Sequence, residues 1–300
     1  MGALGAAVPA AALLSACAAG PTATPGVVAA VGAENQYADV LSQVGGRYVE
    51  VSSVLDDPNS DPHGFELSTS VAKEVGAAAL VVQNGLGYDD FMTKIESATP
   101  NPRRRVLVVQ HLLGLPDATR NPHLWYAPTT MPAVARAVAG ALAALEPDHA
   151  AYFRARLERF DASLQPWRSA VAAFEARYRG VAVATTEPVA DDLLEAMGAD
   201  NRTPFAFQAA VMNGVDPSPQ DISLVHGLLT GHRVRVLCVD AQVVSSLTAS
   251  IRRTALRAGV PVVAVYETMP APGYDFQRWM LAEVRAVERA VAGGVSTERL

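Results

Sequence analysis

The chain has 300 residues, half of them hydrophobic, and a formal net charge of −6. This length suffices for one large domain or two lobes of ordinary size, and the hydrophobic share allows a substantial buried core. The acidic balance argues against a nucleic-acid partner, because binding phosphate backbones requires a basic face.

The first 17 residues have the pattern of an export signal that ends in a cysteine. An Ala- and Leu-rich stretch, too short to cross a bilayer, leads into Leu14-Ser15-Ala16-Cys17. A small residue before a Cys at this place resembles the bacterial lipobox, whose Cys becomes the lipidated first residue of the mature protein. Residues 1–13 lack the usual Lys or Arg, which leaves the true start codon open. The alternative is an ordinary cleaved signal peptide with an incidental Cys.

Strand-like and helix-like segments alternate along the first half of the chain after a flexible tether over residues 18–26. This alternation predicts a parallel sheet covered by helices. The strands are expected over 27–31, 48–55, 80–82 and 106–110, and the helices over 34–44, 67–75, 88–97 and 131–145.

A different stretch, rich in Ala, Arg, Glu and Leu, runs from Pro147 to about Tyr178 and predicts a long helix. Pro166 should kink or interrupt this helix. The alternation then resumes, with strands expected over 181–185, 234–239 and 260–265 and helices over 190–197, 247–258 and 274–292. The second cysteine, Cys238, lies in one of these strand patterns and is expected to be a buried small apolar residue.

The predicted fold class is therefore α/β, with two lobes, each a parallel sheet flanked by helices, joined by one long linking helix. The expected divisions are a signal peptide with lipobox (1–17), a tether (18–26), an N-terminal lobe (27–146), the linking helix (147–180) and a C-terminal lobe (181–300).

Two histidines stand in matching contexts that suggest a metal site. His63 in Asp61-Pro62-His63-Gly64-Phe65-Glu66 and His123 in Asn121-Pro122-His123-Leu124-Trp125 both follow a proline between a strand and a helix. Ligand sites in parallel α/β sheets lie at the carboxyl ends of the strands, and a preceding proline restricts the backbone that aims the imidazole. A lone His is more often a surface or core residue, but two in this arrangement indicate ligation.

Two acidic residues lie just past strand ends in the second half of the chain. Glu187 is in Thr185-Thr186-Glu187-Pro188, and Glu267 is in Val265-Tyr266-Glu267-Thr268. Either carboxylate could bind a ligand, but either could equally be an exposed loop charge or a helix N-terminal contact.

With these residues in view, the chain resembles the metal-binding family of ABC-transporter substrate-binding lipoproteins, also called cluster A-I or cluster 9. The first ligand motif of that family, Asp-Pro-His-x-x-Glu, is similar to residues 61–66, and its Asn-Gly-Leu-Gly is matched by residues 84–87. The second motif, Asp-Pro-His-Leu-Trp, is similar to residues 121–125, with Asn121 in place of Asp. The likeness extends over the whole mature chain.

The resemblance implies four ligands to one metal ion per chain, namely His63, His123, Glu187 and Glu267. In this family the third ligand is usually His in zinc importers and Glu in manganese or iron importers, and Glu187 stands at that position. The fourth is an Asp or Glu after the last strand, for which Glu267 is the nearest match and Asp240 the alternative.

The resemblance further implies a function in metal import. A monomeric, non-enzymatic protein, lipid-anchored through Cys17 on the extracytoplasmic face of the cell membrane, would capture Zn²⁺ or Mn²⁺ between its lobes and deliver it to the permease of an ABC transporter. Two imidazoles and two carboxylates suit Zn²⁺, Mn²⁺ or Fe²⁺, so the sequence leaves the physiological metal open. The linking helix is expected to keep lobe closure small.

Two other classes of function are alternatives. A metal-dependent hydrolase would use the same residues with a bound water, but the chain has no His-Glu-x-x-His helix, and four side-chain ligands would fill the position that a catalytic zinc keeps open. An adhesin or organic-solute receptor on the same scaffold is the second alternative. No Arg or aromatic cluster for an organic solute accompanies the four positions.

Overall fold

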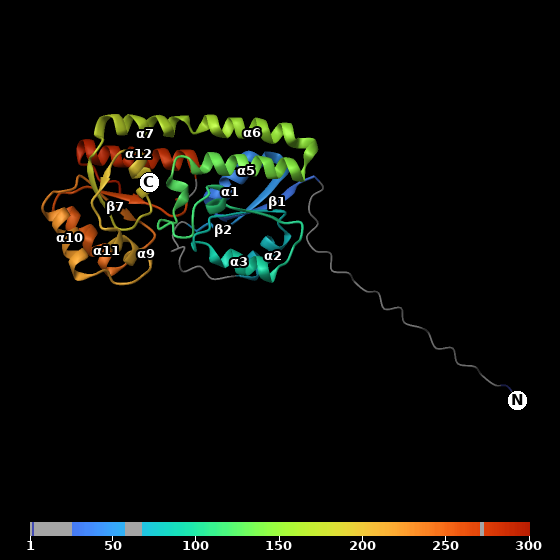
Figure 1. The fold of residues 1–300 in the computed structure, drawn as a ribbon, viewed down its shortest axis with the longest axis horizontal. Helices are drawn as coiled ribbons and strands as arrows, with labels where there is room; N and C mark the ends of the chain where they lie inside the picture. The colour runs from blue at the N-terminus through green and yellow to red at the C-terminus, as the bar shows by residue number, and fades with distance from the viewer. Residues whose placement is uncertain (1, 3–25, 58–67, 271–272) are drawn as a thin grey trace.

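The computed structural model describes residues 2, 26–57, 68–270 and 273–300. Cys17 and His63 therefore lie outside the described residues. The described chain forms two lobes side by side, with long helices running across both (Figure 1).

The N-terminal lobe is built on a four-stranded sheet in the order β2-β1-β3-β4, in which every pair is parallel. One face packs on α1, α5 and the linking helices, and the other packs on α2 and α3 (Figure 1). The strands are β1 (Val28–Glu34), β2 (Val49–Leu55), β3 (Leu80–Gln83) and β4 (Arg105–Val108). The helices are α1 (Asn35–Gly45), η1 (Gly46–Tyr48), α2 (Thr69–Ala77), α3 (Asp90–Ala98), α4 (Val109–Leu112), η3 (Leu124–Tyr126) and α5 (Thr130–Leu145).

The C-terminal lobe repeats this plan with a second parallel sheet in the order β6-β5-β7-β8. Its strands are β5 (Ala182–Thr185), β6 (Asp200–Asn201), β7 (Leu237–Asp240) and β8 (Val262–Val265). Its helices are α8 (Asp191–Ala196), α9 (Phe205–Met212), α10 (Pro219–Thr230), α11 (Ser246–Arg257) and α12 (Phe276–Gly293). Cys238 is buried in β7, as expected.

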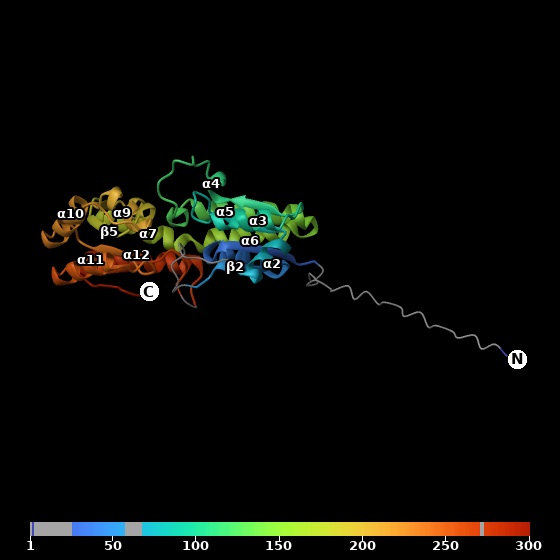
Figure 2. The ribbon, with the colours of Figure 1, turned by 90° about the horizontal axis from the view of Figure 1, so that it is seen from below.

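The lobes are joined by η4 (Pro147–His149) and then by α6 (Ala150–Ser163) and α7 (Gln165–Tyr178), which run end to end along one side of the molecule (Figures 1 and 2). The break at Leu164 lies two residues before Pro166. Proline has no N–H to donate to the preceding turn, so the predicted interruption of the linking helix is confirmed.

The hydrophobic core is continuous between the lobes because the linking helices and α12 contact both. Trp167 of α7 packs edge-on against Phe276 of α12, with ring centroids 5.6 Å apart. Trp279, one turn along α12, packs against Tyr126 of the N-terminal lobe at 5.7 Å. This shared core places the carboxyl edges of the two sheets next to one another.

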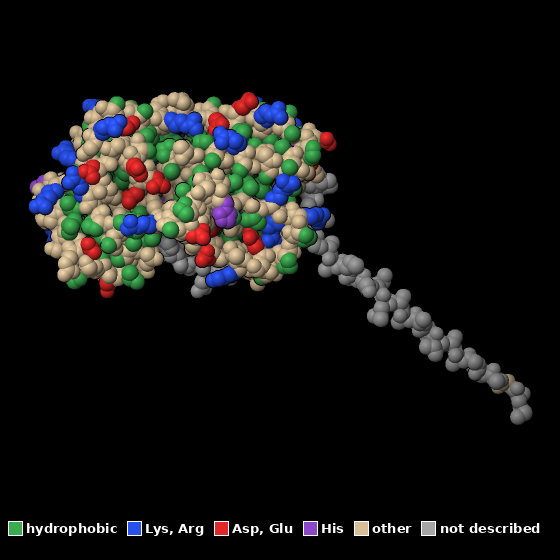
Figure 3. All heavy atoms as spheres, viewed as in Figure 1, with side chains coloured by type: hydrophobic (Ala, Val, Ile, Leu, Met, Phe, Trp, Pro, Cys, Tyr) green, Lys and Arg blue, Asp and Glu red, His purple; other side chains and the backbone are tan. Residues whose placement is uncertain are grey.

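The surface shows acidic and basic side chains interspersed on the face seen in Figure 3, not gathered by sign. Among the described residues, no helix is both long and apolar enough to cross a bilayer.

Candidate metal centre

Three carboxylates meet where the C-terminal sheet faces the N-terminal lobe. Glu187 lies two residues beyond β5, Asp240 is the last residue of β7, and Glu267 lies two residues beyond β8. These three strands are neighbours in the sheet, so their carboxyl ends bring the side chains together. Each offers one oxygen, and these oxygens all lie within 4.8 Å of one another. All three residues are buried.

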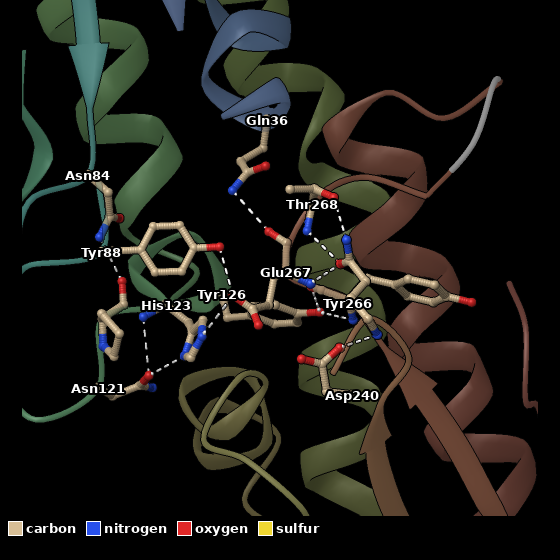
Figure 4. Close-up of polar contacts among 12 residues, drawn as sticks. Gln36, Asn84, Tyr88, Asn121, His123, Tyr126, Asp240, Tyr266, Glu267 and Thr268 are labelled. Atoms are coloured by element: carbon tan, nitrogen blue, oxygen red, sulfur yellow. Dashed lines mark hydrogen bonds and ion pairs between the residues drawn. The ribbon is translucent and has the colours of Figure 1, made fainter. Parts of the chain in front are cut away.

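The N-terminal lobe contributes His123, which is fully buried at the same place (Figure 4). Its Nε2 lies 3.6 Å from Oε2 of Glu267. Ligands bonded to one tetrahedral ion at about 2.1 Å are separated by about 3.4 Å. The imidazole and the carboxylate are therefore spaced as two ligands of a single ion would be.

The orientation of His123 is set by Asn121. The Asn121 Oδ1 accepts hydrogen bonds from the backbone N–H of His123 at 3.1 Å and from its Nδ1 at 2.8 Å (Figure 4). An atom that accepts from a backbone N–H must be the amide oxygen, which assigns the Asn side chain and places the imidazole proton on Nδ1. The Nε2 lone pair is then directed toward the carboxylates, as a metal ligand requires.

Glu267 is held from both lobes. The Tyr88 hydroxyl, from the N-terminal lobe, donates to Glu267 Oε2 at 2.7 Å. The Gln242 Oε1 accepts from the backbone N–H of Glu267 at 2.6 Å and of Thr268 at 3.0 Å, and Gln36 Nε2 donates to the Glu267 carbonyl at 3.2 Å. These contacts leave the Glu267 carboxylate little freedom to turn away from His123.

Tyr88 reaches this position through an unusual turn. Gly85, Leu86 and Gly87 all have positive φ, at 86°, 56° and 77°. A side chain at Gly85 would in addition meet the side chain of Gln110 at 2.8 Å. Glycine is needed where the backbone is left-handed and closely approached, so Gly85 permits the turn that precedes Tyr88.

The electrostatics of the cluster favour a cation. Burial, followed by repulsion from Glu267 and Glu187, raises the pKa of Asp240 well above its ordinary value. Buried like charges are costly unless an opposite charge or protons compensate them. A dication among the three carboxylates would supply that compensation and displace the protons.

The structure thus brings together His123, Glu187, Glu267 and Asp240, four of the five residues singled out by sequence. Asp240 stands beside Glu267 in this cluster. Glu187 is not the N-cap residue of α8, which begins at Asp191 with Ala190 at the N-cap position. The sequence alone indicated no role for Tyr88 or Gln242, although Tyr88 directly follows the Asn-Gly-Leu-Gly motif.

Residues 30–290 match the family model described as ZnuA, zinc-uptake complex component A, periplasmic. The chain belongs to this family. ZnuA-family proteins are binding components of metal-uptake systems and not enzymes, which removes the hydrolase alternative.

Two curated relatives of this ZnuA-family chain are described as putative metal-binding proteins. The one from Thermotoga maritima is 34% identical over 94 residues, covering 31% of this chain and 33% of the relative. The one from Treponema pallidum is 24% identical over 166 residues, covering 48% of this chain and 52% of the relative. The chain thus matches about a third and about half of their lengths.

Among solved structures, the SBP FpvC of Pseudomonas aeruginosa in complex with Ni²⁺ is similar to this chain, with a TM-score of 0.71 and 21% identity. The similarity covers 91% of this chain and 100% of FpvC. The predicted two-lobed α/β fold is confirmed by this likeness and by the two parallel sheets.

Proposed function

We propose that this protein captures one divalent transition-metal ion between its lobes and delivers it to the permease of an ABC importer. The observation that carries the proposal is the buried cluster of Glu187, Asp240 and Glu267, with oxygens within 4.8 Å, together with His123 Nε2 at 3.6 Å from Glu267. A cluster of buried carboxylates facing an oriented imidazole is costly as a purely structural feature and suits a metal dication.

The proposed ligands are His123, Glu187 and Glu267, with His63 from the segment outside the described residues. Asp240 adds a third carboxylate to the same cluster. Oxygen-rich sites suit Mn²⁺, whereas imidazole suits Zn²⁺, and intrinsic affinity places Zn²⁺ above Mn²⁺. We therefore propose Zn²⁺ or Mn²⁺ as the cargo, with one ion per chain.

The test is a calorimetric titration of metal-stripped protein with Zn²⁺ and with Mn²⁺. The expected stoichiometry is one ion per chain, and a His63→Ala, His123→Ala double variant should lose stoichiometric binding. The control is His226→Ala, in a helix away from the cluster. Stoichiometric binding by the double variant would place the metal elsewhere and overturn the proposal.

We further propose that Cys17 carries a lipid anchor on the extracytoplasmic face of the membrane. Residues 18–26 would then tether the rest of the chain to it, namely the N-terminal lobe (27–146), the linker (147–180) and the C-terminal lobe (181–300). The support is the lipobox-like Leu-Ser-Ala-Cys sequence and the family's periplasmic description. Cys17→Ala should move the protein from the membrane fraction to the soluble fraction, whereas Cys238→Ala should not. An unchanged membrane fraction in Cys17→Ala would refute the anchor.

A further inference from the structure

Asn121 is the one position in the second Pro-His motif where this chain departs from the pattern it resembles, and its side chain makes contacts on two sides. Its Oδ1 accepts from His123, as described above. Its Nδ2 donates to Oδ1 of Asp192 at 3.3 Å. Asn121 belongs to the N-terminal lobe and Asp192 to the C-terminal lobe, so this amide connects the lobes at the metal centre.

Asp192 is placed firmly at the end of this connection. It lies in the first turn of α8, and the loop leading into α8 carries Glu187. The neighbouring Asp191 accepts from Asn201 Nδ2 at 2.9 Å and from Gln208 Nε2 at 2.7 Å. These bonds anchor the start of α8 to the rest of the C-terminal lobe, so Asp192 has little freedom to follow a change at residue 121.

The chemistry of the two contacts requires an amide at position 121. The side chain must accept a hydrogen from the imidazole on one side and donate one to a carboxylate on the other. An ionised carboxylate can only accept, so an aspartate at this position would serve His123 but would face Asp192 with a second negative charge at about hydrogen-bond distance. The amide of Asn121 and the carboxylate of Asp192 are thus complementary as donor and acceptor. The pair would stay complementary if aspartate stood at position 121 and asparagine at position 192.

We propose that Asn121 is a positioning residue that couples the orientation of His123 to the docking of the C-terminal lobe, and that Asp192 is its partner in this coupling. The consequence for binding rests on the proposed function, since it requires His123 to ligate the metal. Docking of the lobes at this point and alignment of the imidazole are then coupled through the Asn121 side chain.

The experiment compares Asn121→Asp, Asp192→Asn and the double variant Asn121→Asp/Asp192→Asn by titration with Zn²⁺. Asn121→Asp should lower affinity about 10- to 100-fold, the range for altering a residue that supports a metal ligand, because repulsion from Asp192 moves the new carboxylate away from its place beside His123. Asp192→Asn should change the Zn²⁺ affinity little, because the new amide can turn its oxygen toward the Nδ2 of Asn121. The double variant should recover nearly all of the loss, since its carboxylate at position 121 can accept both from His123 and from the amide at position 192.

A matched control is Asn213→Asp/Asp216→Asn, which makes the same exchange of charge in the exposed loop between α9 and α10. It should bind like the unaltered protein. Wild-type affinity in Asn121→Asp, or a double variant no better than Asn121→Asp, would overturn the proposal.

Two readouts on metal-free protein separate this inference from the proposed function. Small-angle scattering should show a wider separation of the lobes in Asn121→Asp and wild-type dimensions in the double variant. Nitrogen chemical shifts of labelled histidine should show the Nδ1–H form of His123 in wild type and a loss of that preference in Asn121→Ala. If the unaltered protein failed to bind Zn²⁺ or Mn²⁺, the proposed function would fall, while these measurements would still support or refute the coupling. Unchanged scattering in Asn121→Asp would refute it.

Discussion

Glu187→Gln should stabilise the metal-free protein while weakening metal binding. At 4.8 Å and an effective dielectric constant of about 20, two carboxylates repel each other by about 3 kcal/mol. Part of this repulsion is already relieved in the metal-free protein, because the raised pKa of Asp240 favours its protonated form. The realised gain should therefore be about 1–2 kcal/mol. For a domain of this size that corresponds to a rise in Tm of roughly 2–8 °C.

The same substitution removes a charged ligand from the metal. Affinity should fall more than about 100-fold, beyond the loss expected for a residue that only supports a ligand. A 100-fold loss lowers the stabilisation by saturating metal by about 2.7 kcal/mol. Thermal unfolding with excess chelator and with excess Zn²⁺ measures both effects, and the metal-induced rise in Tm should shrink as the metal-free Tm increases.

The matched control for this experiment is Glu195→Gln, the same substitution at an exposed position of α8 in the same lobe. It should leave both melting temperatures unchanged. A Glu187→Gln variant with a lower metal-free Tm and an undiminished metal-induced rise would refute the reasoning, because the cluster would then be stabilising and unconnected with the metal.

Metal binding should release protons, because burial and repulsion keep the pKa of Asp240 high in the metal-free protein and a dication must displace the bound proton. Affinity should therefore increase with pH, and titration in two buffers of different ionisation enthalpy should reveal the release; buffer-independent heats would contradict it. Glu187→His should shift the ratio of affinities toward Zn²⁺ over Mn²⁺, since imidazole is a softer ligand than a carboxylate. Competition between the two metals measures this ratio, and an unchanged ratio would remove Glu187 from the site.

Much of the fold could be predicted because its signals are local. Apolar runs bounded by turn residues marked, within a few residues, seven of the eight strands in the described part of the chain, and Pro166 marked the break in the linking helix. The segment over residues 198–233 gave no such prediction, yet it contains β6, α9 and α10. β6 has only two residues, and α9 (Phe-Ala-Phe-Gln-Ala-Ala-Val-Met) has no polar face to give a helical period. Ser218-Pro219 at the start of α10 was a readable helix signal.

From the sequence, the site could be predicted only to the extent that its residues stand at the ends of predicted strands. Parallel strands end at one edge, so Glu187 and Glu267 could be expected near one another. That Asp240 joins them depends on β7 lying between β5 and β8, and strand order cannot be read from periodicity. The contact of Tyr88 with Glu267 joins residues 179 positions apart across the two lobes, and no local pattern encodes it.

Glu283 is a buried acid of α12 in the core between the lobes. Its Oε1 accepts from Trp279 Nε1 at 3.0 Å and from the Tyr126 hydroxyl at 3.2 Å. Burial raises the pKa of Glu283 to about 8, and these two hydrogen bonds only partly oppose the rise. Between about pH 4.5 and pH 8 the folded protein therefore holds a proton that the unfolded chain has released. Stability from this group is complete below that window and is lost as the pH rises through it, by about 1.4 kcal/mol per pH unit.

Glu283→Gln keeps an oxygen that can accept from Trp279 and Tyr126 but has no proton to lose. Its free energy of unfolding should be close to that of the unaltered metal-free protein at pH 4.5 and should exceed it by about 4 kcal/mol at pH 8. Urea unfolding across this range measures the difference, with Glu288→Gln on the same helix as the control. A difference that stays constant with pH would mean that Glu283 is ionised in the folded core.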